Sequence, residues 1–183
     1  MSTNFWYGDK VNLRAVELKD TEILFKESNQ NIEIQRNLDE IWFPISMEYQ
    51  KEFVINKSKK YAENDEFFFI IENKNGDCIG TINSHHCDKR IGKFQYGISI
   101  WEKYQRKGNA KEAILLLLRY FFKELRYQKV TVFICDFNEK SIELHKKIGF
   151  QKEGQIRRVV YTDGKYFDHI VYGMTKEEFN EID

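Results

Sequence analysis

Residues 105–113 read Gln-Arg-Lys-Gly-Asn-Ala-Lys-Glu-Ala, and they separate two runs of different apolar periodicity. The run before them, residues 94–101, is typical of a strand. In the run after them, apolar residues recur at the spacing of an amphipathic helix, namely at Ile114, Leu117, Leu118, Phe121, Phe122 and Leu125. The stretch therefore predicts a strand, a short polar loop and a helix.

A loop placed in this way can hold an anion, because the first backbone N–H groups of a helix have no partner within the helix and carry the positive end of its dipole. Gly108 would let the backbone approach a ligand closely, and small Ala110 would leave room for it. Arg106 and Lys107 would add positive charge. The residues alone leave two interpretations open, a phosphate site and an ordinary strand-to-helix turn with a solvated basic patch.

Two segments together resemble the GNAT superfamily of N-acetyltransferases. Residues 105–110 are similar to its (Arg/Gln)-x-x-Gly-x-(Gly/Ala) loop, whose backbone amides hold the pyrophosphate of acetyl-coenzyme A (acetyl-CoA). Residues 137–150, Phe-Asn-Glu-Lys-Ser-Ile-Glu-Leu-His-Lys-Lys-Ile-Gly-Phe, resemble its Asn-x-x-(Ala/Ser)-x-x-Leu-(Tyr)-x-Lys-x-Gly-Phe helix. The similarity extends from about Val11 to Phe179, and the C-terminal part suggests the branch that acetylates the N-termini of ribosomal proteins.

The length of 183 residues suits a single domain, residues 1–183. Four helical patterns are found: one after Asp20, one at 46–61, one after the polar loop and one at 138–148. The strand-like runs lie at 10–16, 66–71, 78–83, 94–101, 129–135, 151–160 and 166–174. This order predicts an α/β (α+β) fold with one mixed sheet. The resemblance implies a GNAT-like sheet that is mostly antiparallel, is flanked by helices and has two central parallel strands that splay apart around the cofactor.

The charges balance, with 29 basic and 29 acidic residues, so no global field would attract nucleic acid or an anionic membrane. The N-terminus has no signal-like pattern and no stretch is long and apolar enough for a membrane span, which predicts a soluble, cytoplasmic protein. Cys78, Cys87 and Cys135 form no CxxC pair, which favours buried free thiols in strands over zinc or disulfides.

A group formed by His85, His86 and Asp88 lacks a fourth ligand at a recognisable spacing. We therefore interpret it as a hairpin loop with solvated histidines, and we expect no metal.

The resemblance implies a site for acetyl-CoA as cosubstrate. Backbone groups near Ile98, Ser99 and Ile100 would bind the pantetheine arm as an added strand, and one amide there would polarise the thioester oxygen. The pyrophosphate would lie on the loop formed by Gln105, Arg106, Lys107, Gly108, Asn109 and Ala110. Asn138 would hydrogen-bond the pantetheine or the attacking amine, and Ser141 would bond the cofactor.

Two residues depart from the family pattern where proton transfer is concerned. His145 stands where many relatives carry the tyrosine that acts as general acid, so it is either a substitute proton donor or a solvent-facing helix residue. Gln95 stands where several relatives carry a glutamate that takes the proton of the amine through water. Water, His85 or His86, or an acceptor-side carboxylate such as Glu33 or Glu40 would have to replace it.

The acceptor is the least defined partner. The resemblance places its binding side near residues 31–44, where Trp42 and Phe43 are either pocket wall or core. The leading hypothesis is a protein N-terminus, and the alternative is a polyamine or other small amine, which Glu33, Asp39 and Glu40 would favour by their charge. A regulatory module that binds acyl-CoA with little turnover is a further alternative, and an exposed aromatic sheet edge is compatible with a homodimer.

Overall fold

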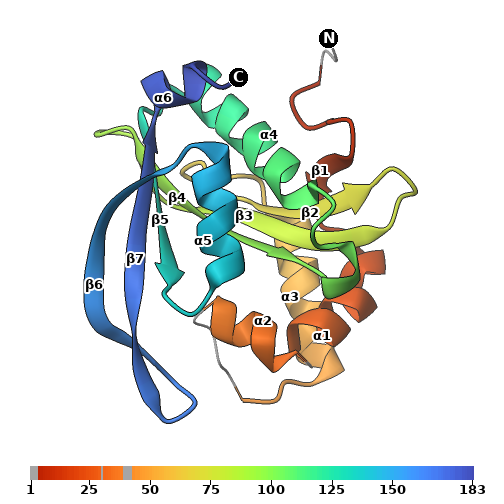
Figure 1. Cartoon of the computed structure of the whole chain (residues 1–183). Coiled ribbons are helices and arrows are strands. Elements are labelled where there is room, and N and C mark those ends of the chain that lie inside the picture. The colour runs from red at the N-terminus through yellow and green to blue at the C-terminus, as the bar shows by residue number, and fades with distance from the viewer. Residues whose placement is uncertain (1–3, 30, 39–42) are drawn as a thin grey trace.

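Alternating apolar residues build one seven-stranded sheet, seen in the computed structural model of residues 4–29, 31–38 and 43–183 (Figure 1). Its order is β1-β2-β3-β4-β5-β7-β6, and every neighbouring pair is antiparallel except β4 and β5. The strands are β1 Val11–Ala15, β2 Phe68–Asn73, β3 Cys78–Asp88, β4 Lys93–Ile100, β5 Lys129–Cys135, β6 Gln151–Thr162 and β7 Lys165–Thr175. The predicted mixed, mostly antiparallel sheet is confirmed.

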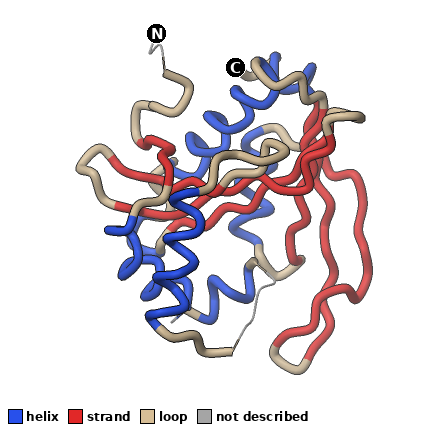
Figure 2. Tube along the Cα trace, turned by 180° about the vertical axis from the view of Figure 1, so that it is seen from behind, coloured by secondary structure: helices blue, strands red, loops and turns tan. Residues whose placement is uncertain are grey.

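Helices cover both faces of the sheet. α4 (Asn109–Lys123) and α5 (Glu139–Ile148) lie side by side on one face, and the view from behind shows α3 (Met47–Lys59) on the other (Figures 1 and 2). The remaining helical segments are η1 Leu18–Asp20, α1 Thr21–Asn29, α2 Ile32–Asn37, η2 Glu102–Tyr104 and α6 Lys176–Asn180. The larger core lies under α4 and α5, where the predicted periodic residues Ile114, Leu117, Leu118, Phe121 and Phe122 are buried.

The two parallel strands β4 and β5 separate soon after they meet. Their register contains only the pairs Lys93 with Lys129 and Phe94 with Val130, at the start of both strands. From there β4 continues along β3 as far as Ile100, while β5 continues along β7 as far as Cys135. The predicted splay of the central strands is therefore confirmed, and it opens toward the carboxyl ends of both strands, the edge at which open sheets bind ligands.

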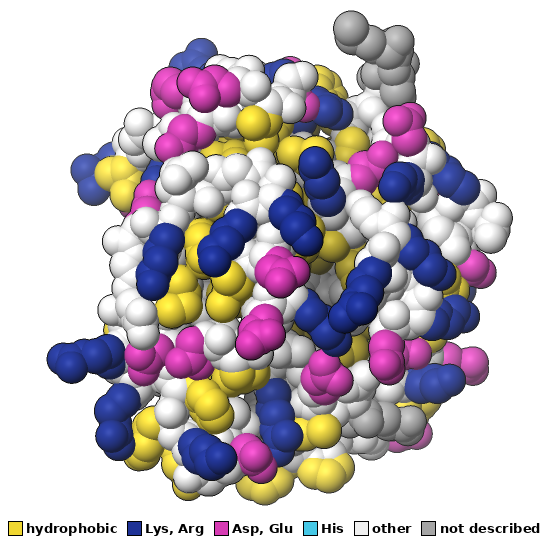
Figure 3. All heavy atoms as spheres, in the orientation of Figure 1, with side chains coloured by type: hydrophobic (Ala, Val, Ile, Leu, Met, Phe, Trp, Pro, Cys, Tyr) yellow, Lys and Arg dark blue, Asp and Glu magenta, His cyan; other side chains and the backbone are white. Residues whose placement is uncertain are grey.

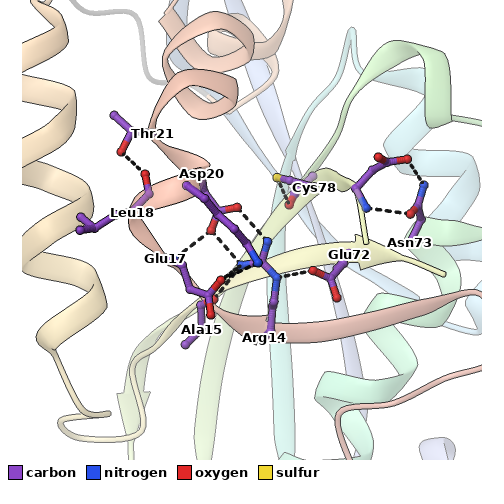
Figure 4. A network of polar contacts seen from close by, with 12 residues as sticks. Arg14, Ala15, Glu17, Leu18, Asp20, Thr21, Glu72, Asn73 and Cys78 are labelled. Atoms are coloured by element: carbon purple, nitrogen blue, oxygen red, sulfur yellow. Dashed lines mark hydrogen bonds and ion pairs between the residues drawn. The ribbon is translucent and has the colours of Figure 1, made fainter. Parts of the chain in front are cut away.

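A half-buried guanidinium fastens β1 and β2 to the turn that precedes α1. Arg14 of β1 donates two hydrogen bonds of 2.8 Å to Asp20 and one of 2.6 Å to Glu72 of β2 (Figure 4). Asp20 is 2% exposed, and its carboxylate also accepts the backbone N–H of Glu17. The bond to Asp20 and, to a smaller extent, the bond to Glu72 raise the pKa of Arg14, so its guanidinium stays charged. The network fixes the start of α1 relative to β1 and β2.

Several expected details differ in the structure. His85, His86 and Asp88 lie on β3, not in a hairpin loop, because β3 runs on to Asp88 through an irregular register in which His86 has a φ of 48°. Cys135 is buried as expected, but Cys78 and Cys87 are only half-buried.

Two helices, α2 and α6, were not predicted as helices, because each is too short to show a full apolar repeat. Phe43 is 89% exposed, which excludes it from the core. The residues Asp39, Glu40 and Trp42, considered above for the acceptor side, lie outside the described residues.

A close backbone contact predicts the effect of a substitution at Gly80 of β3. A Cβ atom there would lie 2.2 Å from the carbonyl oxygen of Ser99 on β4, so Gly80→Ala must push the two strands apart. We expect a loss of unfolding free energy of about 1–3 kcal/mol, measured by urea denaturation. Gly154→Ala on β6 is the matched control, since nothing lies within 4 Å of the added atom. Equal urea midpoints for the two variants would contradict the contact.

Candidate active site

The inner edge of β4 offers backbone groups to the splay. The bond from the Trp101 N–H to the Ile79 carbonyl, 2.9 Å long, sets the phase of the β3–β4 ladder. In an antiparallel ladder the direction of the backbone groups alternates, so those of Ser99 point to β3 while those of Ile98 and Ile100 point to the β5 side. Of the three residues predicted to bind the pantetheine arm, Ile98 and Ile100 therefore direct their backbone groups away from β3, whereas Ser99 is paired within the sheet. The Ile100 carbonyl already accepts a hydrogen bond from the Gln105 side chain.

The loop after β4 has an unusual backbone that brings it to the first turn of α4. Gly108 is the N-cap of α4 with a φ of 83°, and Arg106 has a φ of 60°. The Gln105 side chain donates a 2.9 Å hydrogen bond to the Ile100 carbonyl, which ties the loop to the end of β4. Asn109 donates a bond of equal length to the Tyr104 carbonyl. The predicted loop residues thus lie together at the open end of the splay.

The charges on this loop differ from the sequence expectation. Lys107 turns its ammonium back to the Lys103 carbonyl, 2.9 Å away, and over the ring of Tyr104. The lysine that does reach the loop is Lys10, whose Nζ donates a 3.0 Å bond to the Lys107 carbonyl. Lys10 was missed because it lies 97 positions away in the sequence and carries no motif of its own.

The N-terminus of α5 faces the other side of the splay, after β5. Asn138 is the N-cap, and its side-chain oxygen accepts the backbone N–H of Ser141 at 3.1 Å. The Ser141 hydroxyl lies 3.3 Å from Nδ1 of His145, one turn further on. The structure therefore brings the three predicted catalytic residues together on one helix, with both polar side chains at its N-terminus half-buried.

His145 is not a solvent-facing residue; it is 2% exposed and both ring nitrogens are occupied. Nδ1 lies 2.7 Å from the Ser141 carbonyl, which can only accept, so the proton of the neutral ring is on Nδ1. Nε2 then accepts the phenolic O–H of Tyr96, 2.8 Å away. Tyr96 lies on β4, is 6% exposed, and was not singled out from the sequence because nothing in its local pattern marks a partner 49 positions distant.

Burial lowers the pKa of His145 to about 4, because the charged imidazolium would lose its hydration. The ring is therefore neutral at pH 7 and holds no proton on Nε2 to donate. This geometry favours a positioning role, in which His145 orients Tyr96, over the role of general acid.

Among the bases that the sequence left open, His85, His86 and Glu33 lie in the described residues, and His86 is exposed on β3. His85 lies directly opposite Gln95 in the β3–β4 register, and cross-strand neighbours share a face of the sheet. Burial, with a smaller effect of His86, lowers the pKa of His85, so its ring is neutral and can accept a proton. Glu33 on α2 instead pairs with Lys140 of α5 at 3.4 Å and borders an open depression of about 470 Å³ between α1 and α2.

The surface carries both signs of charge. Figure 3 shows Lys and Arg side chains interspersed with Asp and Glu over the face with α4 and α5. Within the described part of the chain, no three His, Cys, Asp or Glu residues are grouped to hold a metal ion. Nor does any helix formed by the described residues have the length and hydropathy needed to cross a bilayer.

The buried neutral histidine predicts how stability depends on pH. The ordinary pKa of His145 is 6.5 and its folded pKa is about 4, so the unfolded chain binds an extra proton between these values. The free energy of unfolding should fall as the pH is lowered from about 6.5 to about 4, by up to ~1.4 kcal/mol per pH unit. His145→Gln should remove the share of that slope that comes from His145 in urea denaturation, whereas the control His86→Gln, at an exposed site, should keep that share. An unchanged slope in His145→Gln would refute the buried neutral state.

Comparison with known proteins agrees with this arrangement. The sequence model of the acetyltransferase (GNAT) domain family matches residues 10–151 of this chain. The uncharacterized N-acetyltransferase YokL, derived from the SPbeta prophage of Bacillus subtilis strain 168, is 42% identical over 98% of this chain and 97% of its own length. YdaF of the same strain, provisionally named a ribosomal N-acetyltransferase, is 29% identical over 94% of each chain.

A spermidine N(1)-acetyltransferase of Vibrio cholerae is 26% identical over 88% of this chain and 90% of its own length. The crystal structure of spermidine N-acetyltransferase from that organism with CoA and spermine superimposes with a TM-score of 0.82, at 22% identity over 94% of this chain and 99% of that one. That structure shares the fold. Because the family match covers well over half of the sequence, this protein belongs to the GNAT family of acetyltransferases.

Proposed function

We propose that the protein is an acetyl-CoA-dependent N-acetyltransferase that transfers the acetyl group to a primary amine by direct attack within a ternary complex. The observation that carries the proposal is the separation of β4 from β5 after Phe94 and Val130, with the Gly108 loop at the open end. The pantetheine arm would pair with Ile98 and Ile100, and the pyrophosphate would lie on the backbone N–H groups from Arg106 to Ala110.

The reaction needs few protein groups. The neutral amine attacks the thioester carbon, the C–S bond breaks, and CoA leaves as a thiolate that takes up one proton while the amine loses one. A backbone N–H of β4 would stabilise the oxyanion, and Asn138 and Ser141 would hold the amine and the cofactor. We favour His85 as the group that accepts the amine proton. The Tyr96–His145 pair would form the side of the cleft against which the thioester lies.

For the acceptor we favour a protein N-terminus. A polyamine site needs carboxylates that no basic group neutralises, yet Glu33 pairs with Lys140, and Lys26 accompanies Glu27 in the depression beside α2. The relationship to YdaF supports this choice. The spermidine N(1)-acetyltransferase of V. cholerae supports the polyamine alternative, and Asp39 and Glu40, which lie outside the described residues, would then supply the charge.

The fold also leaves room for a module that binds acyl-CoA with little turnover, because Gln95 and a neutral His145 replace the usual proton-transfer groups. Release of free thiol from acetyl-CoA with any amine acceptor would exclude it. A homodimer remains a prediction from the outer strand β6, where Ile156, Val159 and Tyr161 are exposed. Analytical ultracentrifugation would test it, and a monomer at all concentrations would exclude it.

Two glycines with nearly the same φ angle allow a controlled test of the cofactor loop. Gly108 and Gly76 have φ values of 83° and 85°, so a valine is similarly strained at either position. A Cβ at Gly108 would lie 2.8 Å from Nζ of Lys10 in the loop, whereas one at Gly76, in the β2–β3 turn, meets nothing within 4 Å. In calorimetric titration with CoA, Gly108→Val should bind at least about tenfold more weakly than Gly76→Val, which should match the wild type. Equal affinities would place the cofactor elsewhere.

The acceptor can be tested with three substrates of similar size in a thiol-release assay. A short peptide with a free N-terminus should be acetylated, while the same peptide with a blocked N-terminus and spermidine should react at least about tenfold more slowly in kcat/KM. Faster turnover of spermidine than of the free peptide would reverse the order of the two acceptor hypotheses.

A further inference from the structure

Three backbone N–H groups of the N-terminal segment converge on one carboxylate of α4. Glu112, in the first turn of α4, accepts the N–H groups of Asp9 at 2.9 Å, Lys10 at 2.7 Å and Val11 at 2.7 Å. These donors lie 101 to 103 positions from Glu112 in the sequence. Charge-assisted bonds to a carboxylate are among the stronger hydrogen bonds in proteins. The chain before β1 is therefore held against the start of α4.

This attachment carries the side chain of Lys10 to the loop. Its Nζ reaches the Lys107 carbonyl at 3.0 Å and lies 2.8 Å from the position that a Cβ of Gly108 would take. An ammonium group has three N–H donors, and the Lys107 carbonyl takes one. Among the described residues no carboxylate lies within 4.0 Å of this ammonium, as an ion pair would require. The charge is thus available to a ligand.

We propose that Lys10 binds a phosphate of the cofactor pyrophosphate and that Glu112 is the residue that positions it. The proposal rests on the proposed function, because the ligand is the cofactor of that reaction. It assigns to Lys10 the charge that the sequence pattern attributed to Lys107, whose ammonium is turned to Lys103 and Tyr104. An ammonium acts on phosphate as a point charge and needs no bidentate geometry, which suits a lysine that arrives from a neighbouring segment.

Calorimetric titration with CoA and with 3′-dephospho-CoA tests the assignment. Lys10→Met keeps the aliphatic stem and removes the charge, and the exposed Lys59→Met at the end of α3 is the matched control. We expect Lys10→Met to raise the Kd for both ligands by about tenfold, an effect that shrinks as salt is raised from about 0.05 to 0.5 M. Lys59→Met should leave both Kd values unchanged.

The Glu112→Gln variant distinguishes the positioning of Lys10 from a general disturbance of the cofactor site. If Glu112 acts through Lys10, this change raises the Kd for CoA in the wild-type background and has no further effect in the Lys10→Met background. Additive effects would overturn the positioning role of Glu112.

The remaining outcomes separate the inference from the proposed function. A wild-type protein that binds CoA alongside a Lys10→Met variant of equal affinity overturns the role of Lys10 and leaves the acetyltransferase proposal intact. If Lys10→Met loses affinity for CoA but not for 3′-dephospho-CoA, the pyrophosphate assignment is overturned, because the contact is then with the 3′-phosphate. A folded wild-type protein that binds neither ligand overturns the proposed function and the inference with it.

Discussion

The parting of two parallel strands governs the rest of this structure. β4 and β5 share only their first residue pairs, and each is then held by its other neighbour, β4 by β3 and β5 by β7. A sheet interior normally leaves no backbone group unpaired, because an unsatisfied N–H or C=O away from water is costly. Here β4 and β5 do not pair with each other beyond Phe94 and Val130. At the ends of the strands, Gln105 and Asn138 donate to the carbonyls of Ile100 and Cys135. The candidate active site is thus a gap in strand pairing that the flanking antiparallel pairs keep open.

Much of this arrangement could be predicted from the sequence because it depends on residues that are close together in the chain. The helical spacing from Ile114 to Phe122 and the alternation in β1 each depend on residues a few positions apart, and so did the polar loop around Gly108. The short helix α2 shows the limit, since six residues do not span two turns and its cap at Asn31 gave only a weak signal. The irregular end of β3 at His85 and His86 likewise depends on how β4 returns, which no local pattern records.

The chemistry of the site was harder to predict than its position. Asn138 and Ser141 belong to one motif on one helix, so their proximity followed from their spacing. The protonation state of His145 depends instead on how deeply the ring is buried, and its hydrogen-bond partner Tyr96 comes from β4, 49 positions earlier in the sequence. Lys10 reaches the loop through a carboxylate on a different element. Electrostatic properties of a site arise from such convergence, and sequence spacing does not encode it.

The bond between Tyr96 and His145 also constrains how this protein can change over evolutionary time. The strand carries the aromatic hydroxyl of this pair, and the helix supplies the ring nitrogen that accepts its hydrogen bond. His145 is 2% exposed, so replacing either partner alone by an apolar residue leaves a buried polar atom without a hydrogen bond. Each single substitution is therefore disfavoured. The two positions are expected to vary as a pair among the nearest relatives, either as tyrosine with histidine or with both polar groups lost together. A change at His145 of α5 is therefore expected to require a matching change at Tyr96 of β4, 49 positions earlier in the sequence.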